Sequence, residues 1–325
     1  MALARFLARR VMFGFVLVFV VSSGALLLTR LAPGDVAGDL VGSGASLQAV
    51  ARERARYGLD RPILEQYAGW LSRAARFDFG PSIMFGRPVG ELVGQRAANT
   101  ALLAAFALLL ATLVGLPLGV VSGSRRGGLL TGAIRAASLV CLSLPPLVTS
   151  LVFVCIAART GWLPIGGMTS IDASGTEWLA WLRDVAWHLP LPAVALALPI
   201  AAMLERLQSQ AMGETLRQTF VLAALARGVP AGRLVWRDGL RASLRMVASI
   251  YGLVVGGLLS GSFVVEIVTS WPGLGRLMYD ALRARDLYLV AGCATAGSVF
   301  LAVATVLSDL ALAAIDPRVR AEEQG

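Results

Sequence analysis

Six uncharged, apolar stretches, each long enough to cross a lipid bilayer, dominate this chain of 325 residues. A membrane-spanning helix needs about 18–25 apolar residues, and its backbone must satisfy its own hydrogen bonds. Hydrophobic residues make up 57% of the chain and charged residues only 15%, which excludes an ordinary soluble domain. The predicted fold is therefore an all-α integral membrane protein with six transmembrane helices, at residues 11–29, 97–124, 136–158, 185–204, 246–265 and 287–308.

Two of these spans admit a second interpretation. Three arginines precede the first span, as in a secretory signal peptide, but its 19 uncharged residues exceed the usual apolar region of about 7–15, and residues 29–33 form a poor cleavage site. We expect the first span to be retained. Three prolines interrupt the fourth span, which we expect to be a kinked helix because neighbouring helices can satisfy the freed backbone groups.

The placement of arginine predicts the orientation. Fifteen arginines lie in the N-terminal segment, around residues 125–135, in 205–245 and in the C-terminal tail, whereas five lie in the two short loops opposite. Positively charged loops stay inside, so both termini are predicted to be cytoplasmic. The net charge of +9 then reflects topology and contact with lipids. It does not indicate nucleic-acid binding, because the arginines are dispersed and lack interleaved aromatic residues.

Residue types that carry chemistry are scarce. The chain has no lysine, so it cannot supply the phosphate-binding lysine of a P-loop ATPase. Its single histidine, His188, offers no cluster for zinc, and Cys141, Cys155 and Cys293 fall within predicted spans without metal-ligand spacing. We therefore expect no catalytic residues, no metal site and no cofactor bound by this chain.

Residues 31–96 are too patterned for a disordered linker and predict a small helical insertion on the external face. One helix is expected at 46–57 and a second from Pro62 towards residue 76. The aromatic residues expected to pack this insertion are Trp70, Phe77, Phe79 and Phe85. A further segment, 175–187, carries three tryptophans and is typical of an interfacial helix.

The long polar stretch 205–245 lies between two spans and predicts a helix, a tight corner and a second helix. Gly228 would end the first helix, and Pro230 suits the first turn of the next. Arginines then recur at every fourth residue, at Arg233, Arg237, Arg241 and Arg245. Like charges at this spacing repel one another, so we expect a neutralising partner, either lipid headgroups or an acidic protein surface.

The corner at 224–228 resembles the "EAA" loop of importer permeases of ATP-binding-cassette (ABC) systems. Other runs extend the resemblance in collinear order: RLAPGD at 30–35, YGLDRP at 57–62, GRPV at 86–89, GLPLG at 115–119, LSLP at 142–145, GWLP at 161–164, HLPLP at 188–192, VVE at 264–266, SWPGLG at 270–275 and DPRVR at 316–320. The chain thus resembles, over nearly its whole length, the first permease subunit of the dipeptide, oligopeptide and nickel import family. It departs from the family pattern at two places. Residues 222–224 are Leu-Ala-Ala where the family has the start of its glutamate-alanine signature, and residues 245–246 are Arg-Met where the family usually has an apolar residue and a proline. Both departures affect the expected fit to the ATPase.

The resemblance implies a type I ABC importer permease fold. The first helix ends near residue 30, the extracytoplasmic helical insertion covers 31–96, the permease core covers 97–315, and a cytoplasmic tail follows at 316–325. Implied partners are a second homologous permease subunit, two P-loop ATPase subunits that bind ATP and Mg²⁺, an extracytoplasmic substrate-binding protein and membrane lipids. The cargo is best expected to be peptide, with nickel chelates, glutathione-like thiols and sugars as alternatives, carried by alternating access across the bacterial cytoplasmic membrane.

The resemblance also assigns candidate residues. The ATPase-coupling contact would lie at Ala224, Ala226, Arg227, Gly228, Arg233, Arg237 and Arg241. Candidates for the pathway or its gate are Gly256, Gly257, Glu266 and Trp271. Helix packing, an ion pair with Arg276 and interfacial anchoring are the structural alternatives for the glycines, the glutamate and the tryptophan respectively.

An ion- or proton-coupled secondary carrier is the alternative class of function. Such a carrier needs titratable groups near the bilayer midplane. Asp309, near the cytoplasmic end of the sixth span, is the nearest acidic residue of this kind. The predicted spans therefore favour an importer permease over a carrier.

Overall fold

The computed structural model describes residues 2–31, 60–125, 127–170 and 177–315, together with 46, 48, 51, 52 and 55. Apart from one isolated bridge between Pro81 and Pro88, the regular structure of these residues is helical. Five of the helices are long and apolar enough to cross a membrane, and a sixth span results if a bent pair counts as one. The chain divides into two compact units, one formed by 1–8, 102–271 and 304–325 and the other by 9–101 and 272–303.

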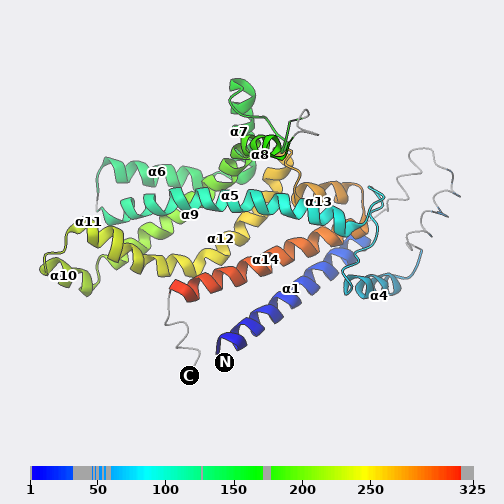
Figure 1. Ribbon diagram of the computed structural model, residues 1–325, viewed down its shortest axis with the longest axis horizontal. Coiled ribbons are helices and arrows are strands. Elements are labelled where there is room, and N and C mark those ends of the chain that lie inside the picture. Colours follow the sequence, from blue (N-terminus) through cyan, green and yellow to red (C-terminus); the bar gives the residue numbers. More distant parts are fainter. Residues whose placement is uncertain are drawn as a thin grey trace. The chain divides into compact units, whose positions relative to one another are not determined.

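The helices shown in Figure 1 are α1 (Ala2–Leu31), α4 (Ile63–Ala74), α5 (Val89–Ser124), α6 (Leu129–Ser143), α7 (Pro146–Thr160), α8 (Trp178–His188), α9 (Pro190–Thr215), α10 (Thr219–Ala226), α11 (Ala231–Arg233), η2 (Leu234–Gly239), α12 (Leu240–Val268), α13 (Leu274–Arg283) and α14 (Leu287–Ile315). The first, second, fifth and sixth predicted spans lie within α1, α5, α12 and α14. Each of these helices continues beyond its apolar stretch.

The third predicted span, residues 136–158, is not one straight helix. α6 ends at Ser143 and α7 begins at Pro146, and the two helices are bent by 102° at this break. Leu144 is extended because it precedes Pro145, and the two prolines lack amide hydrogens for a continuous helix. Each helix has 15 residues, about 22 Å, which is shorter than the roughly 30 Å of a bilayer's hydrocarbon core. This region is therefore a broken span or a re-entrant loop.

The fourth predicted span, residues 185–204, has shifted bounds. α9 begins only at Pro190, because proline is favoured in the first turn of a helix, where no helical hydrogen bond is lost. It continues to Thr215, so the first part of the predicted polar loop is helical. The segment before α9 forms α8, a separate helix with exposed tryptophans that corresponds to the one predicted at 175–187.

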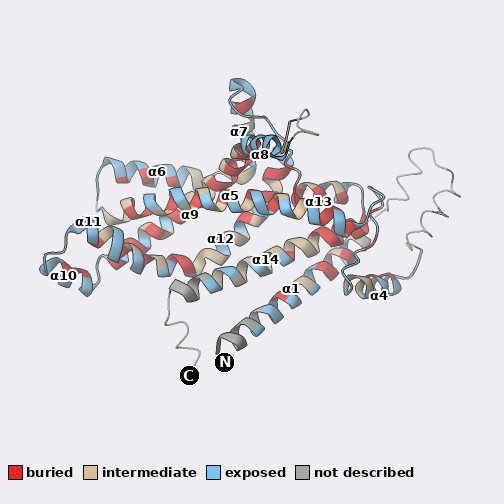
Figure 2. Ribbon diagram, viewed as in Figure 1, coloured by how far each residue is buried: buried red, intermediate tan, exposed pale blue. Residues whose placement is uncertain are grey.

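The first unit is organised around α9. Its buried residues follow the helix along most of its length, where α6, α7 and α12 pack against it (Figure 2). The largest apolar cluster of this unit joins side chains from α5, α9 and α12, among them Leu103, Leu196 and Leu258. By contrast, α6 and α7 expose apolar residues along their outer faces, which is expected of helices that meet lipid or another subunit.

Three glycines let α5 approach α9 at backbone distance. They recur at every fourth residue and therefore share one face of α5. A methyl group placed on each would lie 2.5, 2.7 and 2.5 Å from a carbonyl oxygen of α9, for the pairs Gly115 with Ala201, Gly119 with Glu205, and Gly123 with Ser209. No side chain fits in that space, so glycine is required at each position of this glycine seam.

A buried carboxylate organises the second unit. Asp286 has no exposed surface and accepts hydrogen bonds from the hydroxyl of Ser82 at 2.7 Å and from the amide of Met84 at 3.0 Å. Its other oxygen accepts from the amide of Leu289 at 3.2 Å, as expected for the capping residue of α14. One side chain therefore both caps a helix and fixes the loop that precedes α5.

The second helix of the predicted insertion is present as α4. It follows Pro62 and buries Trp70, while Tyr67 on it shares a 2.9 Å hydrogen bond between hydroxyls with Ser23 of α1. Phe77, expected to pack the insertion, is instead 85% exposed, at a backbone φ of 62° just after the helix ends. The helix predicted at 46–57 lies largely outside the described residues.

The glycine seam predicts that adding a single methyl group to one of its glycines lowers the stability of the protein. Gly119→Ala should lower the free energy of unfolding by about 1–3 kcal/mol, the usual cost of overpacking, because its Cβ would lie 2.6 Å from that of Gln208. Gly94→Ala is the matched control on the same helix, since its Cβ meets no atom within 4 Å. Thermal unfolding in detergent measures both, and equal midpoints for the two variants would contradict the seam.

Candidate functional site

The corner after α10 has a defined helix-ending geometry. Gly228 adopts a φ of 80°, and its amide donates to the carbonyl of Leu225 at 2.9 Å. The amide of Val229 donates to the carbonyl of Ala224 at 3.1 Å. This pair of bonds is the Schellman motif, in which a left-handed residue, usually glycine, satisfies the last carbonyls of a helix. The prediction that Gly228 ends the helix is confirmed.

A small apolar cluster holds the corner in place. Val221 and Ala224 of α10 and Leu234 of η2 are buried together, and Val229 packs against them. Ala224 therefore faces inward in this chain and supports the corner. Ala226, Arg227 and Gly228 are exposed and form its outer surface.

The four arginines after the corner are exposed, at Arg233, Arg237, Arg241 and Arg245. The helix continues through Gly239, but residues Leu234–Gly239 form a π-helical segment. An α-turn holds about 3.6 residues and a π-turn about one more, so residues four apart lie on roughly the same side in either kind of turn. The four exposed arginines thus form a basic surface on this segment. Because these arginines are exposed, a partner outside the chain can neutralise their charges and offset their mutual repulsion.

A buried polar layer joins α5, α9 and α12 beside the corner. The hydroxyl of Ser122 donates to Oε1 of Glu205, and the amide group of Gln208 donates to the hydroxyl of Ser243 at 2.8 Å. These four side chains are at most 1% exposed. Among the described residues, Oε2 of Glu205 and Oε1 of Gln208 have no hydrogen-bond partner.

The sequence interpretation missed this polar layer. It placed Glu205 at the start of the cytoplasmic loop, whereas α9 continues ten residues further and carries Glu205 into the bundle. The available signal was the spacing of three residues between Glu205 and Gln208, which puts both side chains on one helix face.

The glycines of α12 lie on two different faces. A methyl group on Gly261 would contact α9 at 3.2 Å, and one on Gly252 would contact α14 at 3.3 Å. Gly257 is exposed, with no atom within 4 Å of a methyl group placed there, and the neighbouring Gly256 is half-buried. The helix therefore has a packed face and, at Gly257, an open one.

Glu266 and Trp271, the other candidates for the pathway, have no exposed surface. Trp271 belongs to the main apolar cluster of the first unit. Nearby, the carbonyl of Thr269 accepts a 2.9 Å hydrogen bond from the amide of Gly167, which ties the loop after α7 to the end of α12. In this structure both side chains support the end of α12. Asp309 lies in α14, with its side chain outside the described residues.

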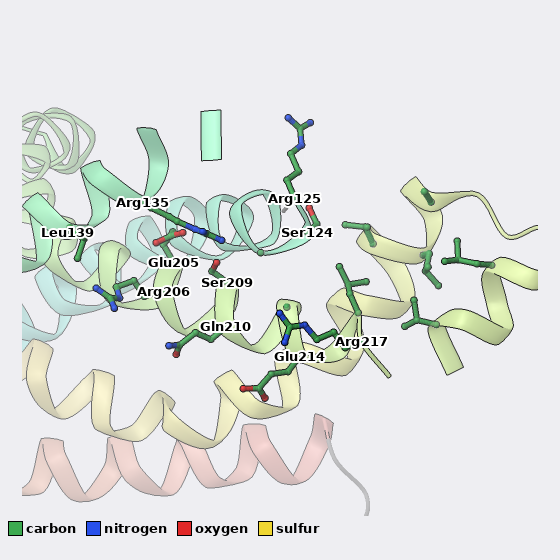
Figure 3. Close-up of a pocket in the computed structure, with 18 residues that line it drawn as sticks. Ser124, Arg125, Arg135, Leu139, Glu205, Arg206, Ser209, Gln210, Glu214 and Arg217 are labelled. Atoms are coloured by element: carbon green, nitrogen blue, oxygen red, sulfur yellow. The ribbon is translucent and has the colours of Figure 1, made fainter. Parts of the chain in front are cut away.

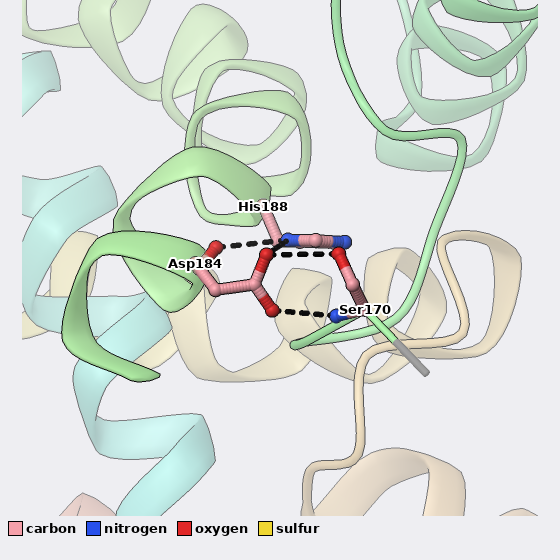
Figure 4. A network of polar contacts seen from close by, with 3 residues as sticks. All are labelled: Ser170, Asp184 and His188. Atoms are coloured by element: carbon pink, nitrogen blue, oxygen red, sulfur yellow. Dashed lines mark hydrogen bonds and ion pairs between the residues drawn. The ribbon is translucent and has the colours of Figure 1, made fainter. Parts of the chain in front are cut away.

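The only histidine takes part in a polar network with Asp184 and Ser170 (Figure 4). Asp184 accepts from the amide of Ser170 at 2.6 Å and from its hydroxyl at 2.9 Å, and the Nδ1 atom of His188 lies 3.5 Å from the same carboxylate. The serine hydroxyl therefore faces the carboxylate and not the imidazole, which is not the order of a nucleophilic triad. The network instead fastens the loop before residue 170 to α8.

The amide of Ser170 is the main reason why the pKa of Asp184 lies below its ordinary value of 3.8. Desolvation opposes this shift, and the hydroxyl of Ser170 and the charge of His188 add to it. No group of three or more potential metal ligands occurs among the described residues.

These helices and the corner between two of them define a helical multi-pass membrane protein. Residues 115–321 match the family described as "Binding-protein-dependent transport system inner membrane component", and residues 3–79 match the N-terminal region described as "Binding-prot-dependent transport system membrane comp, N-term". The chain belongs to this family of inner membrane transport components.

Individual relatives cover nearly the whole chain. The probable peptide ABC transporter permease protein y4tP of Sinorhizobium fredii is 31% identical, with 97% of this chain and 99% of the relative aligned. The oligopeptide transport system permease proteins AppB of Bacillus subtilis and OppB of Mycobacterium tuberculosis are 30% and 34% identical, each over 98% of this chain and 99% of the relative.

A solved structure supports the fold. The MetNI methionine ABC transporter, in an inward-facing conformation, has a chain that superposes with a TM-score of 0.52 at 16% identity. The superposition covers 69% of this chain and 96% of that chain. The fold of an ABC importer permease is therefore shared.

The Ser170–Asp184 contact predicts a pH dependence. Because the pKa of Asp184 is lowered, the contact contributes at pH values above 3.8 and is lost as the pH falls through the lower folded-state value. Asp184→Asn should mimic the protonated state and speed hydrogen exchange at the Ser170 amide at neutral pH. Hydrogen exchange with mass spectrometry, with Glu177→Gln as the control on the same segment, measures this. Unchanged protection in Asp184→Asn would refute the contact.

Proposed function

We propose that this chain is the permease subunit of an ATP-driven importer that moves cargo across the cytoplasmic membrane by alternating access. The observation that carries the proposal is the corner at Arg227 and Gly228, which two backbone hydrogen bonds hold in a Schellman motif and at which both residues are exposed. A chain without lysine has no P-loop, so the ATP and Mg²⁺ would be bound by partner subunits.

The corner suits a protein partner because it combines apolar and basic groups. Leu222 and Leu225 of α10 are 62% and 46% exposed beside the exposed Arg227. Exposed apolar side chains flanked by charge are typical of a docking surface. In the proposed coupling, Ala226, Arg227, Gly228 and the arginines Arg233, Arg237 and Arg241 contact an ATPase subunit, and Ala224 holds the corner in shape from within.

The polar layer gives this corner a mechanical connection to the bundle. α10 packs on η2, which continues directly into α12, and Gln208 links α9 to Ser243 of α12. A displacement of the corner would therefore move the base of α12. In the proposed cycle, ATP binding closes two ATPase subunits, the corner transmits the movement, and the open face of α12 at Gly256 and Gly257 lines the pathway. Glu266 and Trp271 would support the outer end of that helix.

The remaining partners are proposed from the family. A second homologous permease subunit would complete the pathway, and an extracytoplasmic binding protein would deliver the cargo. The names of the relatives, which describe peptide and oligopeptide permeases, make peptide the proposed cargo. The distribution of arginines supports cytoplasmic termini.

Purification of the tagged chain from its native membrane in mild detergent tests the proposal. Mass spectrometry should identify a second permease and P-loop ATPases bound to it. A chain that is recovered alone, even after crosslinking through a cysteine introduced beside Gly228, would contradict the coupling role. That result would favour the secondary carrier.

Gly228 provides a sharper test of the corner. Gly228→Val should weaken co-purification of the ATPase by about tenfold or more, because a left-handed backbone costs a non-glycine residue about 1–2 kcal/mol and a β-branched residue more. Gly228→Asn is the matched control, since asparagine tolerates this conformation. Within this chain a methyl group at this position meets no atom within 4 Å, so the substitution would disturb the fold of the chain only through its backbone conformation. Equal ATPase recovery and ATP-driven uptake in both variants would exclude the corner as the coupling element.

A further inference from the structure

A large basic pocket lies behind the corner, within the first unit (Figure 3). Its volume is about 1030 Å³, which is enough for a small ligand or a lipid headgroup. Four arginines from separate segments line it: Arg125 after α5, Arg135 on α6, Arg206 on α9 and Arg217 between α9 and α10. Only two acidic residues, Glu205 and Glu214, line it as well.

The pocket carries a net positive charge, because four arginines line it with two glutamates. Arg125, Arg206 and Arg217 are exposed, and none of them forms an ion pair with the part of the chain that the structure describes. Arg135 donates a 3.2 Å hydrogen bond to the carbonyl of Ser122. Like charges around one cavity repel one another, and a bound anion would offset this repulsion.

The buried carboxylate of Glu205 lies at the floor of the pocket. One of its oxygens accepts the hydroxyl of Ser122, and Arg135 donates to the carbonyl of that same serine. Figure 3 shows Arg135 extending across the cavity beside Glu205 and Ser209. This polar layer therefore positions Arg135, whereas the exposed Arg125 points away from Glu205 and the exposed Arg217 lies beside Glu214 in Figure 3.

Apolar surface borders the pocket on the side of α6. Leu139, which lines the cavity, is 51% exposed, and the neighbouring Val140 is 61% exposed. α6 belongs to the bent pair that is apolar enough to enter a membrane. A basic cavity at the edge of an apolar helix surface is placed where the phosphates of a bilayer meet the acyl chains.

We propose that this pocket binds a phosphate group, with the arginines Arg125, Arg135, Arg206 and Arg217 as its ligands. The apolar border favours a phosphodiester carried by an anionic phospholipid, and a headgroup with two phosphates matches four guanidinium groups. A soluble phosphate is the other source of the same chemistry. Because α9, α10 and η2 all contribute to the pocket, a bound phosphate would tie the corner to the membrane edge.

A paired substitution tests the pocket without disturbing packing. In Arg125→Gln with Arg217→Gln, both altered side chains are exposed. The matched control is Arg159→Gln with Arg183→Gln, which removes the same charge from exposed positions outside this pocket. The full chain would be placed in phosphatidylcholine nanodiscs that contain a minor fraction of cardiolipin, and native mass spectrometry would measure the cardiolipin retained. In detergent, thermal stabilisation by inorganic phosphate, compared with chloride, would measure the soluble source.

The pocket variant should retain cardiolipin about tenfold or more weakly than the parent and the control. Arg125→Lys with Arg217→Lys should restore part of the binding, because lysine keeps the charge but loses the bidentate contact. Stabilisation by inorganic phosphate that only the pocket variant loses, with unchanged cardiolipin, would identify a soluble phosphate as the ligand. Equal retention of cardiolipin and equal phosphate response in the pocket and control variants would overturn the proposal.

Discussion

The approach of α5 to α9 at backbone distance is the constraint on which the first unit depends. The glycine seam of Gly115, Gly119 and Gly123 brings α5 against the carbonyl oxygens of α9, and α6, α7 and α12 also pack against α9. Apolar side chains gain little by leaving lipid for a helix interface, so close van der Waals contact supplies the association energy in a membrane. The same closeness brings the hydroxyl of Ser122 to Glu205, and polar contacts then fix how the two helices are turned.

Buried polar side chains and exposed arginines lie close together near the corner of the first unit. Inside, Glu205 and Gln208 are held in hydrogen bonds away from solvent, where breaking one partner of a pair is costly. Outside, several arginines are exposed, both around the pocket and in the segment after the corner. Their charges can be neutralised by groups outside the chain. The inner layer makes the region rigid, and the outer charges make it responsive to whatever binds. The coupling role proposed for this loop would use both properties.

Much of the helical architecture follows from the sequence, because long apolar stretches and the glycine at 228 act locally. The break between α6 and α7 could have been anticipated from the adjacent Pro145 and Pro146, although hydropathy alone gave a single span. The burial of Glu205 follows less directly, since a charged residue at the end of an apolar run is normally assigned to solvent. Its spacing from Gln208 places both side chains on one helix face, and the packing of three helices then hides them. Phe77 is the opposite case, because it was predicted to be packed and is exposed. Its left-handed backbone turns the aromatic side chain outward.

The π-helical segment leads directly into α12 and so links the corner to the direction in which α12 faces. A π-turn holds about one residue more than an α-turn, and successive residues of an α-helix are rotated by about 100°. Because a π-turn fits its additional residue into a single turn, removal of one residue from Leu234–Gly239 would leave an α-turn and hardly change the direction in which α12 faces. The face that carries Gly257 is therefore insulated from a one-residue change in this segment, whereas the same change in the regular part of α12 before Gly257 would turn that face by about 100° relative to the corner.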